Sequence, residues 1–247
     1  MAEPTAALSV PLPETDRPLL TYYDDATGER TELSAAELGS WSARTAALLH
    51  DGCGLQAGGS AAVLLPPHWQ TAVVLLGAWS AGVAVSFRSW ATAGLSAPLE
   101  QLDAVFVSRR RLDSWLEEVP AARHRFVLGL APGLRPLTEV PADYRDFAAE
   151  VVRHPDDAPA YAALRPGDAA SPDGTTYAQW NDIARSIAAS SQLRPGDRVL
   201  VEASDHEQPV QWLLAPLVAG ASIVLCANLD RDALDARVAA EGVTRVL

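Results

Sequence analysis

The chain has 247 residues, 49% of them hydrophobic and 20% charged, and its formal net charge is −12. This length and composition indicate a globular protein of one large or two small domains, and they exclude a disordered or fibrous chain. The acidic balance argues against a nucleic-acid or anionic-membrane partner. No apolar run approaches the roughly 20 residues of a membrane span, so we expect no membrane partner of any kind.

The first segment, residues 1–17, is rich in proline, alanine and glutamate, and it has no basic stretch followed by an apolar core. It is therefore interpreted as a flexible tail and not as a secretory signal. The two cysteines, Cys53 and Cys226, stand alone, and the five histidines are scattered. We expect a cytoplasmic protein with reduced thiols and no metal site.

A first α/β unit is predicted over residues 18–130. Ser34 and Glu37 have the spacing of a capping box, in which each side chain accepts from the other residue's backbone amide. Apolar residues at helical spacing follow this box, and then short apolar runs alternate with helical segments. The predicted elements are a helix that starts behind Ser34 and is ended by Gly52 and Gly54, a strand over 61–65, a helix over 68–81 and strands over 83–87, 104–107 and 125–128.

Two segments near the end of this unit leave alternatives open. A helix is predicted near 112–118, and the preceding Arg109-Arg110-Arg111 is interpreted as a solvated turn, with an anion site as the alternative. Residues 131–160 are rich in proline and acidic residues and are interpreted as a connector between two units, which could also pack as one domain.

A second α/β unit is predicted over residues 161–247. It alternates helices and strands in the same way, which favours parallel sheets with right-handed crossovers. The predicted elements are helices over 177–190, 206–218 and 230–241 and strands over 199–203, 222–226 and 243–247. Because the sequence stops on a strand, we expect the front part of something longer, with an edge open to a protein partner or to a second copy.

An internal repeat relates the two units. Displaced by 138 positions, residues 55–85 fall on 193–223 without a gap, with nine identities in 31 positions. The matches include Gly58 with Gly196 and Gly82 with Gly220, at predicted turns. The predicted fold class is therefore α/β, with two tandem related units, each a mostly parallel sheet flanked by helices.

Several short motifs carry a resemblance to a known family. They are Gly54-Leu55-Gln56-Ala57-Gly58-Gly59, Leu64-Leu65-Pro66, Ala81-Gly82, Pro195-Gly196-Asp197-Arg198-Val199 and Pro216-Leu217-Val218-Ala219-Gly220-Ala221. In this order and spacing, residues 18–247 resemble the front part of the large N-terminal domain of AMP-forming adenylating enzymes: acyl-CoA synthetases, peptide-synthetase adenylation domains and luciferases. The chain looks like a short relative of actinobacterial type.

The resemblance implies a phosphate-binding loop directly before residue 177. Family members join a carboxylate to ATP, so ATP or AMP with magnesium is the implied cofactor, and Ser171, Gly174, Thr175 and Thr176 are the implied binding residues. The second glycine and the lysine of the family's loop are missing, and Asp173 adds a negative charge where phosphate would lie. A structural interpretation is favoured instead: residues 172–174 form a turn, and Thr175 or Thr176 caps the next helix.

His206 falls near a histidine that lines the acyl pocket in the family. Its counterpart in the repeat is His68, which favours a shared structural role at the start of a helix. No catalytic residue is assigned to this chain, because the family's remaining catalytic parts have no counterpart in it and all 19 of its basic residues are arginine.

Three functions remain open from the sequence. The first is a degenerate, non-catalytic relative retained as a binding or interaction module. The second is one subunit of a split acyl-adenylate or acyl-CoA ligase, completed by a C-terminal partner in trans. The third is a different small-molecule enzyme that uses the cleft between the two units, although no group of residues supports it.

Overall fold

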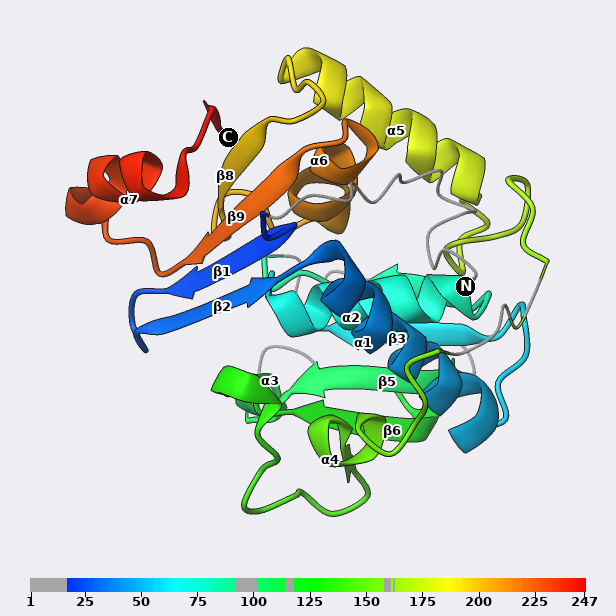
Figure 1. Cartoon of the computed structure of the whole chain (residues 1–247). Coiled ribbons are helices and arrows are strands. Elements are labelled where there is room, and N and C mark those ends of the chain that lie inside the picture. The colour runs from blue at the N-terminus through cyan, green and yellow to red at the C-terminus, as the bar shows by residue number, and fades with distance from the viewer. Residues whose placement is uncertain (1–16, 92–101, 114–117, 158–160, 162) are drawn as a thin grey trace.

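The computed structural model describes residues 17–91, 102–113, 118–157, 161 and 163–247. Two five-stranded sheets are separated by a layer of helices (Figure 1). The strands are β1 (Leu20–Asp24), β2 (Glu29–Leu33), β3 (Ser60–Leu64), β4 (Ala84–Phe87), β5 (Leu102–Ser108), β6 (Ala122–Leu128), β7 (Arg145–Asp146), β8 (Arg198–Glu202), β9 (Ser222–Ala227) and β10 (Arg245–Val246). The predicted α/β class with helix-flanked, mostly parallel sheets is confirmed.

The helices alternate with these strands along the chain. The α-helices are α1 (Ala35–Ala47), α2 (Trp69–Ser80), α3 (Arg109–Leu112), α4 (Phe147–Val151), α5 (Tyr177–Ser190), α6 (Ala215–Val218) and α7 (Leu234–Glu241). Shorter helical turns are η2 (Leu48–Gly52), η3 (Pro132–Leu134), η4 (Val210–Leu214) and η5 (Arg231–Ala233). Among the described helices, none has the length and apolar content that crossing a bilayer demands.

One sheet has the order β4-β3-β5-β6-β7 and is parallel throughout. The other has the order β10-β8-β9-β1-β2, in which only the β1–β2 pair is antiparallel. The β1–β2 hairpin begins the predicted first unit but pairs with β9 of the second, with Leu20 opposite Ile223. The division into two units with a connector at residues 131–160 stays a prediction. One sheet nevertheless contains strands from both predicted units, β1 and β2 from the first and β8, β9 and β10 from the second.

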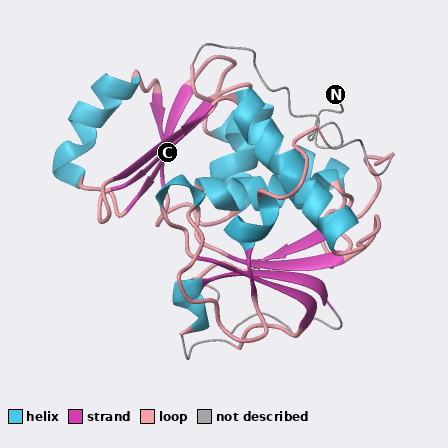
Figure 2. Cartoon of the chain, turned by 60° about the horizontal axis from the view of Figure 1, so that its bottom comes forward, coloured by secondary structure: helices cyan, strands magenta, loops and turns pink. Residues whose placement is uncertain are grey.

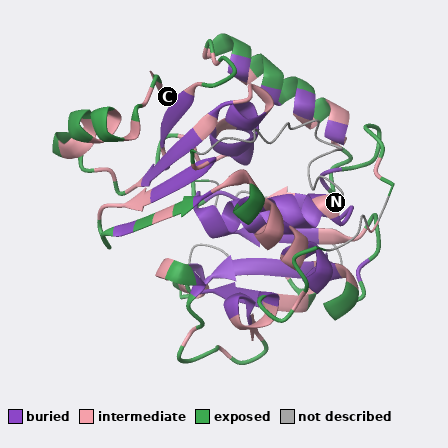
Figure 3. Cartoon of the chain, in the orientation of Figure 1, coloured by how far each residue is buried: buried purple, intermediate pink, exposed green. Residues whose placement is uncertain are grey.

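The helix α2 lies between the two sheets, as Figures 1 and 2 show. Nearly every residue in it is buried, from Trp69 through Trp79. A helix that is apolar all round needs neighbours on every side, and α2 contacts α1, β1 and β4. One hydrophobic core therefore includes Val63 and Phe106 of one sheet and Val201 and Ile223 of the other. In Figure 3 most of α2 and of the strands β3, β5, β8 and β9 is buried, whereas β2 is partly exposed and α5 and α7 expose their outer faces.

The repeated segments have equivalent backbone geometry. The register Ser60↔Ala84 of β3 and β4 corresponds to Arg198↔Ser222 of β8 and β9, each pair being displaced by 138 positions. The amide of Gly58 donates to the carbonyl of Gly82, and the amide of Gly196 donates to that of Gly220. All four glycines have a positive φ, between 73° and 89°, a conformation that glycine adopts without strain.

Three predicted elements differ from the structure. The helix predicted from His206 begins only at Val210, because residues 203–205 form a turn and residues 206–208 are not helical. The helix predicted near 112–118 appears as α3, Arg109–Leu112, and residues 114–117 lie outside the described part. Within the predicted connector, α4 contributes buried Phe147 to the core against Phe106. The β1–β2 hairpin was missed, although the Thr27-Gly28 turn between residues of high strand propensity was a usable signal.

Candidate functional site

The predicted phosphate loop is a tight turn whose amides bond within the loop and its flanks. The amides of Ala170 and Ser171 both donate to the carbonyl of Thr175, and the amide of Gly174 donates to the carbonyl of Ser171. The amide of Thr175 donates to Oδ1 of Asp173, 3.0 Å away. A loop that cradles phosphate instead presents free amides to its ligand.

Thr176 caps helix α5. Its side chain accepts from the amide of Gln179, and the Gln179 side chain accepts from the Thr176 amide, which completes a capping box. This is the structural role that the sequence favoured for Thr175 or Thr176. The Ser34–Glu37 capping box at α1 is also present as predicted.

A cavity of about 260 Å³ lies between the two repeated segments, where β4, α2 and the loop meet α5 and η4. We call it the Asp173 cavity. Two of its walls are tryptophans whose indole N–H groups bond to the loop: Trp79 donates to the carbonyl of Ala170, and Trp180 donates to Oγ of Ser171. The described lining residues are Trp79, Val85, Ser86, Phe87, Ser171, Pro172, Asp173, Trp180, Gln208, Pro209, Val210 and Leu214.

Only one of the four implied phosphate-binding residues, Ser171, lines this cavity. Gly174, Thr175 and Thr176 are not among its described lining residues. No sequence pattern indicated that Trp79, Phe87 and Gln208 belong to a site, and Trp180 was predicted to lie on the apolar stripe of a helix. The missed signal was the position of Trp180, one turn after the loop and therefore directed back toward it.

A second cavity, of about 180 Å³, lies at the carboxyl ends of β3, β4 and β5. Its charged lining residues are Arg110, Arg111 and Glu207, and the amide of Ala91 donates to Glu207 at 3.0 Å. The solvated turn predicted for Arg109–Arg111 is wrong for Arg111, which is 3% exposed. The Arg111 guanidinium donates to the carbonyls of Arg88 and Ser89, and it lies over the ring of Trp90.

His206 lies in the turn between β8 and η4, where its amide donates to the carbonyl of Glu202. The next two residues, Glu207 and Gln208, each line one of the two cavities, but His206 is not among the described lining residues of either. The shared structural role expected for His68 and His206 is wrong. His68 caps α2 and is 2% exposed, whereas Pro209 is the cap residue of η4.

A buried polar group surrounds His68. Trp69 donates its indole N–H to Oε1 of Glu29 at 3.0 Å, and Nε2 of His68 lies 3.8 Å from Oε2 of Glu29. Burial lowers the pKa of His68 and keeps the ring neutral, so Nδ1, which accepts from Gln70, leaves the proton on Nε2. Both Glu29 and His68 are almost fully buried, so this pair fixes the start of α2 and offers no surface to a ligand.

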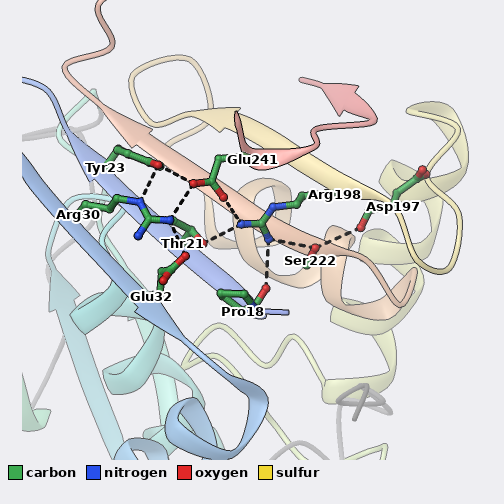
Figure 4. A network of polar contacts seen from close by, with 9 residues as sticks. All are labelled: Pro18, Thr21, Tyr23, Arg30, Glu32, Asp197, Arg198, Ser222 and Glu241. Carbon is green, nitrogen blue, oxygen red and sulfur yellow. Dashed lines mark hydrogen bonds and ion pairs between the residues drawn. The ribbon is translucent and has the colours of Figure 1, made fainter. Parts of the chain in front are cut away.

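A polar network joins α7 to its sheet (Figure 4). Glu241 accepts from Tyr23 and Arg30 with one carboxylate oxygen and from Arg198 with the other. Burial alone would raise the pKa of Glu241, but the hydrogen bonds from Tyr23, Arg198 and Arg30 lower it to about 2. Arg198 also donates to Pro18, Thr21 and Ser222. These groups bond to one another, which indicates a structural cluster.

Within the described residues, no three His, Cys, Asp or Glu side chains lie close enough together to hold a metal ion. The two cavities described above are candidate places for a small ligand. The Asp173 cavity is the larger, and it lies at the loop that the sequence singled out.

No protein-family model matches the chain. Over 235 residues it is 39% identical to a "TIGR03089 family protein" of Mycobacterium tuberculosis, covering 93% of this chain and 91% of that relative. The structure of this chain resembles the acetoacetyl-CoA synthetase of Streptomyces lividans, with a TM-score of 0.71 at 20% identity over 99% of this chain. It also resembles an acyl-CoA synthetase of Brucella canis, with a TM-score of 0.68 at 18% identity over 99% of this chain.

The chain spans 42% and 49% of the lengths of those two enzymes. Likeness at this level of identity shows the fold alone. The fold expected from the sequence, that of the N-terminal domain of adenylate-forming enzymes, is confirmed.

Proposed function

The chain belongs to the TIGR03089 family, and from this premise we propose that it is a non-catalytic protein with the fold of an adenylate-forming enzyme, retained as a module that binds a small molecule. The observation that carries this proposal is the loop before α5. The amides of Ala170, Ser171, Gly174 and Thr175 donate to oxygens of the loop itself, and that of Thr176 donates to Gln179 of α5.

Two further features support the proposal. Asp173 lines the cavity at this loop, and a carboxylate repels the phosphates of ATP. All 19 basic residues of the chain other than histidine are arginine, and an arginine does not reproduce the geometry of a compact ammonium group. The net charge of −12 favours a small molecule or a protein as partner over nucleic acid or an anionic membrane.

The test is ATP–pyrophosphate exchange by the purified protein with magnesium and a panel of short, long and aromatic carboxylic acids. We expect no exchange above the rate without protein. Exchange with any acid in the panel would contradict the proposal.

A variant sharpens the test by acting on the loop itself. Asp173→Ala removes the acceptor of the Thr175 amide and the negative charge of the cavity at once, so we expect it to bind Mg-ATP more tightly than the unmodified chain does, as measured by calorimetry. Asp182→Ala is the matched control, because Asp182 is an exposed carboxylate on α5 outside the cavity. Equal ATP binding by all three proteins would show that the loop is not what excludes phosphate.

The split-ligase hypothesis is the second candidate, because the chain spans less than half of the solved synthetases. It requires that exchange appear when a partner supplies the missing portion. Adding the C-terminal part of a synthetase in trans and repeating the exchange assay tests this candidate, and exchange only in the mixture would favour it over the first.

A further inference from the structure

Three aromatic side chains and one carboxylate characterise the Asp173 cavity. The aromatic residues are Trp79, Phe87 and Trp180, the carboxylate belongs to Asp173, and none of the described lining residues is basic. All arginines and histidines of the chain lie in its described part, and Asp173 forms an ion pair with none of them. The negative charge at this cavity therefore has no cationic partner within the described protein.

The two indole rings are held in fixed orientations. Their only hydrogen-bond donors are used on Ala170 and Ser171, at 3.1 Å and 2.8 Å. These N–H groups are therefore not available to a ligand in the cavity. The face of an aromatic ring carries negative potential and attracts organic cations, and tryptophan does so most strongly.

Asp173 is oriented by the loop in a similar way. Its Oδ1 accepts the amide of Thr175 at 3.0 Å, and this hydrogen bond occupies only part of the acceptor capacity of a carboxylate. The volume, about 260 Å³, falls below the roughly 300–1,000 Å³ of sites for drug-sized ligands. A compact ligand fits this space better than an acyl-adenylate does.

We propose that the Asp173 cavity binds a small organic cation, an amine or quaternary ammonium group on a compact apolar body, between Trp79, Trp180 and Phe87 with Asp173 as its counter-charge. The inference rests on the proposed function, since it names the class of ligand for that binding module. It reverses the charge preference that a phosphate site would have.

The test compares three molecules of similar shape by calorimetry. They are choline, its uncharged isostere in which a tert-butyl group replaces the trimethylammonium group, and the carboxylate 3,3-dimethylbutanoate, which carries the same tert-butyl group. We expect choline to bind roughly five- to thirtyfold more tightly than the uncharged isostere, as cation–π and exposed charge interactions together allow. The carboxylate should bind most weakly of the three.

Variants locate the binding. Asp173→Asn keeps an oxygen that can accept the Thr175 amide, and it should weaken choline binding about fivefold while leaving the uncharged isostere unchanged. Trp180→Leu should weaken choline binding, whereas Asp182→Asn, which removes an equal charge from the exposed side of α5, should leave it unchanged.

Equal binding of choline and its uncharged isostere, no choline binding at all, or choline binding that ignores Asp173→Asn would each overturn the cation assignment. None of these results bears on the exchange assay with ATP. Failure of the proposed function, seen as pyrophosphate exchange, is therefore distinguishable from failure of this inference.

Discussion

Glu241 is the last residue of α7, a position where the helix dipole disfavours a carboxylate. The cationic groups of Arg30 and Arg198 and the hydroxyl of Tyr23 offset this. Only 4% of the Arg198 side chain and 7% of the Glu241 side chain are exposed, so each of these charges depends on the other for compensation.

Glu241→Gln should lower the free energy of unfolding by roughly 3 kcal/mol, because a buried arginine loses its counter-charge. Urea unfolding followed by circular dichroism measures the change. Glu32→Gln is the control: Glu32 pairs with the same Arg30, but both side chains are more than 40% exposed, so the loss should stay below about 1 kcal/mol. Equal losses in the two variants would contradict the assigned role of Glu241.

The same carboxylate predicts a dependence on pH. Its pKa is lowered from 4.5 to about 2 in the folded chain, so protons bind the unfolded state more readily. The stabilisation is therefore complete above the unfolded pKa and is lost as the pH falls through the folded one. The difference in unfolding free energy between the unmodified chain and Glu241→Gln should shrink between about pH 4.5 and about pH 2. A constant difference across that range would show that the carboxylate is not responsible.

At the scale of elements, the contact between α1 and α2 depends on Gly77. A Cβ atom at Gly77 would lie 2.5 Å from Cβ of Thr45 and 2.7 Å from the carbonyl oxygen of Ser42. The two helices thus approach so closely that their backbones nearly touch, which is what lets α2 fit between the two sheets.

Gly77→Ala should destabilise the chain by roughly 2 kcal/mol, because overpacking outweighs the gain of about 1 kcal/mol in helix propensity. Gly39→Ala in α1 meets nothing within 4 Å, so it should stabilise by about 0.5–1 kcal/mol. Thermal unfolding of the two variants checks the opposite signs. A stabilised Gly77→Ala protein would mean that the helices can separate without cost.

How far the elements could be predicted depends on where their determinants lie. Helix α5 was predicted over its whole length, Tyr177–Ser190, because its cap and its apolar stripe are local. The start of η4 was misplaced because turns after β8 replace the expected first helical turn. The pairing of β1 with β9 joins residues far apart in the sequence, and no local pattern encodes it.

The site was predictable in the same limited sense. The residues of the loop were found, and the N-cap role of Thr176 follows from its position before an apolar stripe. The cavity was not found, because its walls come from α2, β4, α5 and η4. Which faces of these elements meet is decided by the packing of the two repeated segments and not by any one of them.

At the scale of the molecule, both sheets share one hydrophobic core through α2. Chains of this length often populate folding intermediates, but a shared core couples the two sheets. We therefore expect a single unfolding transition in urea, with coincident curves from far-ultraviolet circular dichroism and tryptophan fluorescence. Two separated transitions would show that the sheets are independently stable.

The pairing of β1 with β9 also constrains how the chain can fold as it is made. Leu20 can pair with Ile223 only after Ile223 has been synthesised, and a ribosome adds that residue roughly 10–40 s later at about 5–20 residues per second. Until then the edge of β1 that will bond to β9 lacks its partner, and Leu20 and Tyr22 lack the surroundings that bury them. The hairpin is thus the first part of its sheet to be synthesised and must wait for the rest, so during translation it is a natural substrate for chaperones that shield unpaired strands.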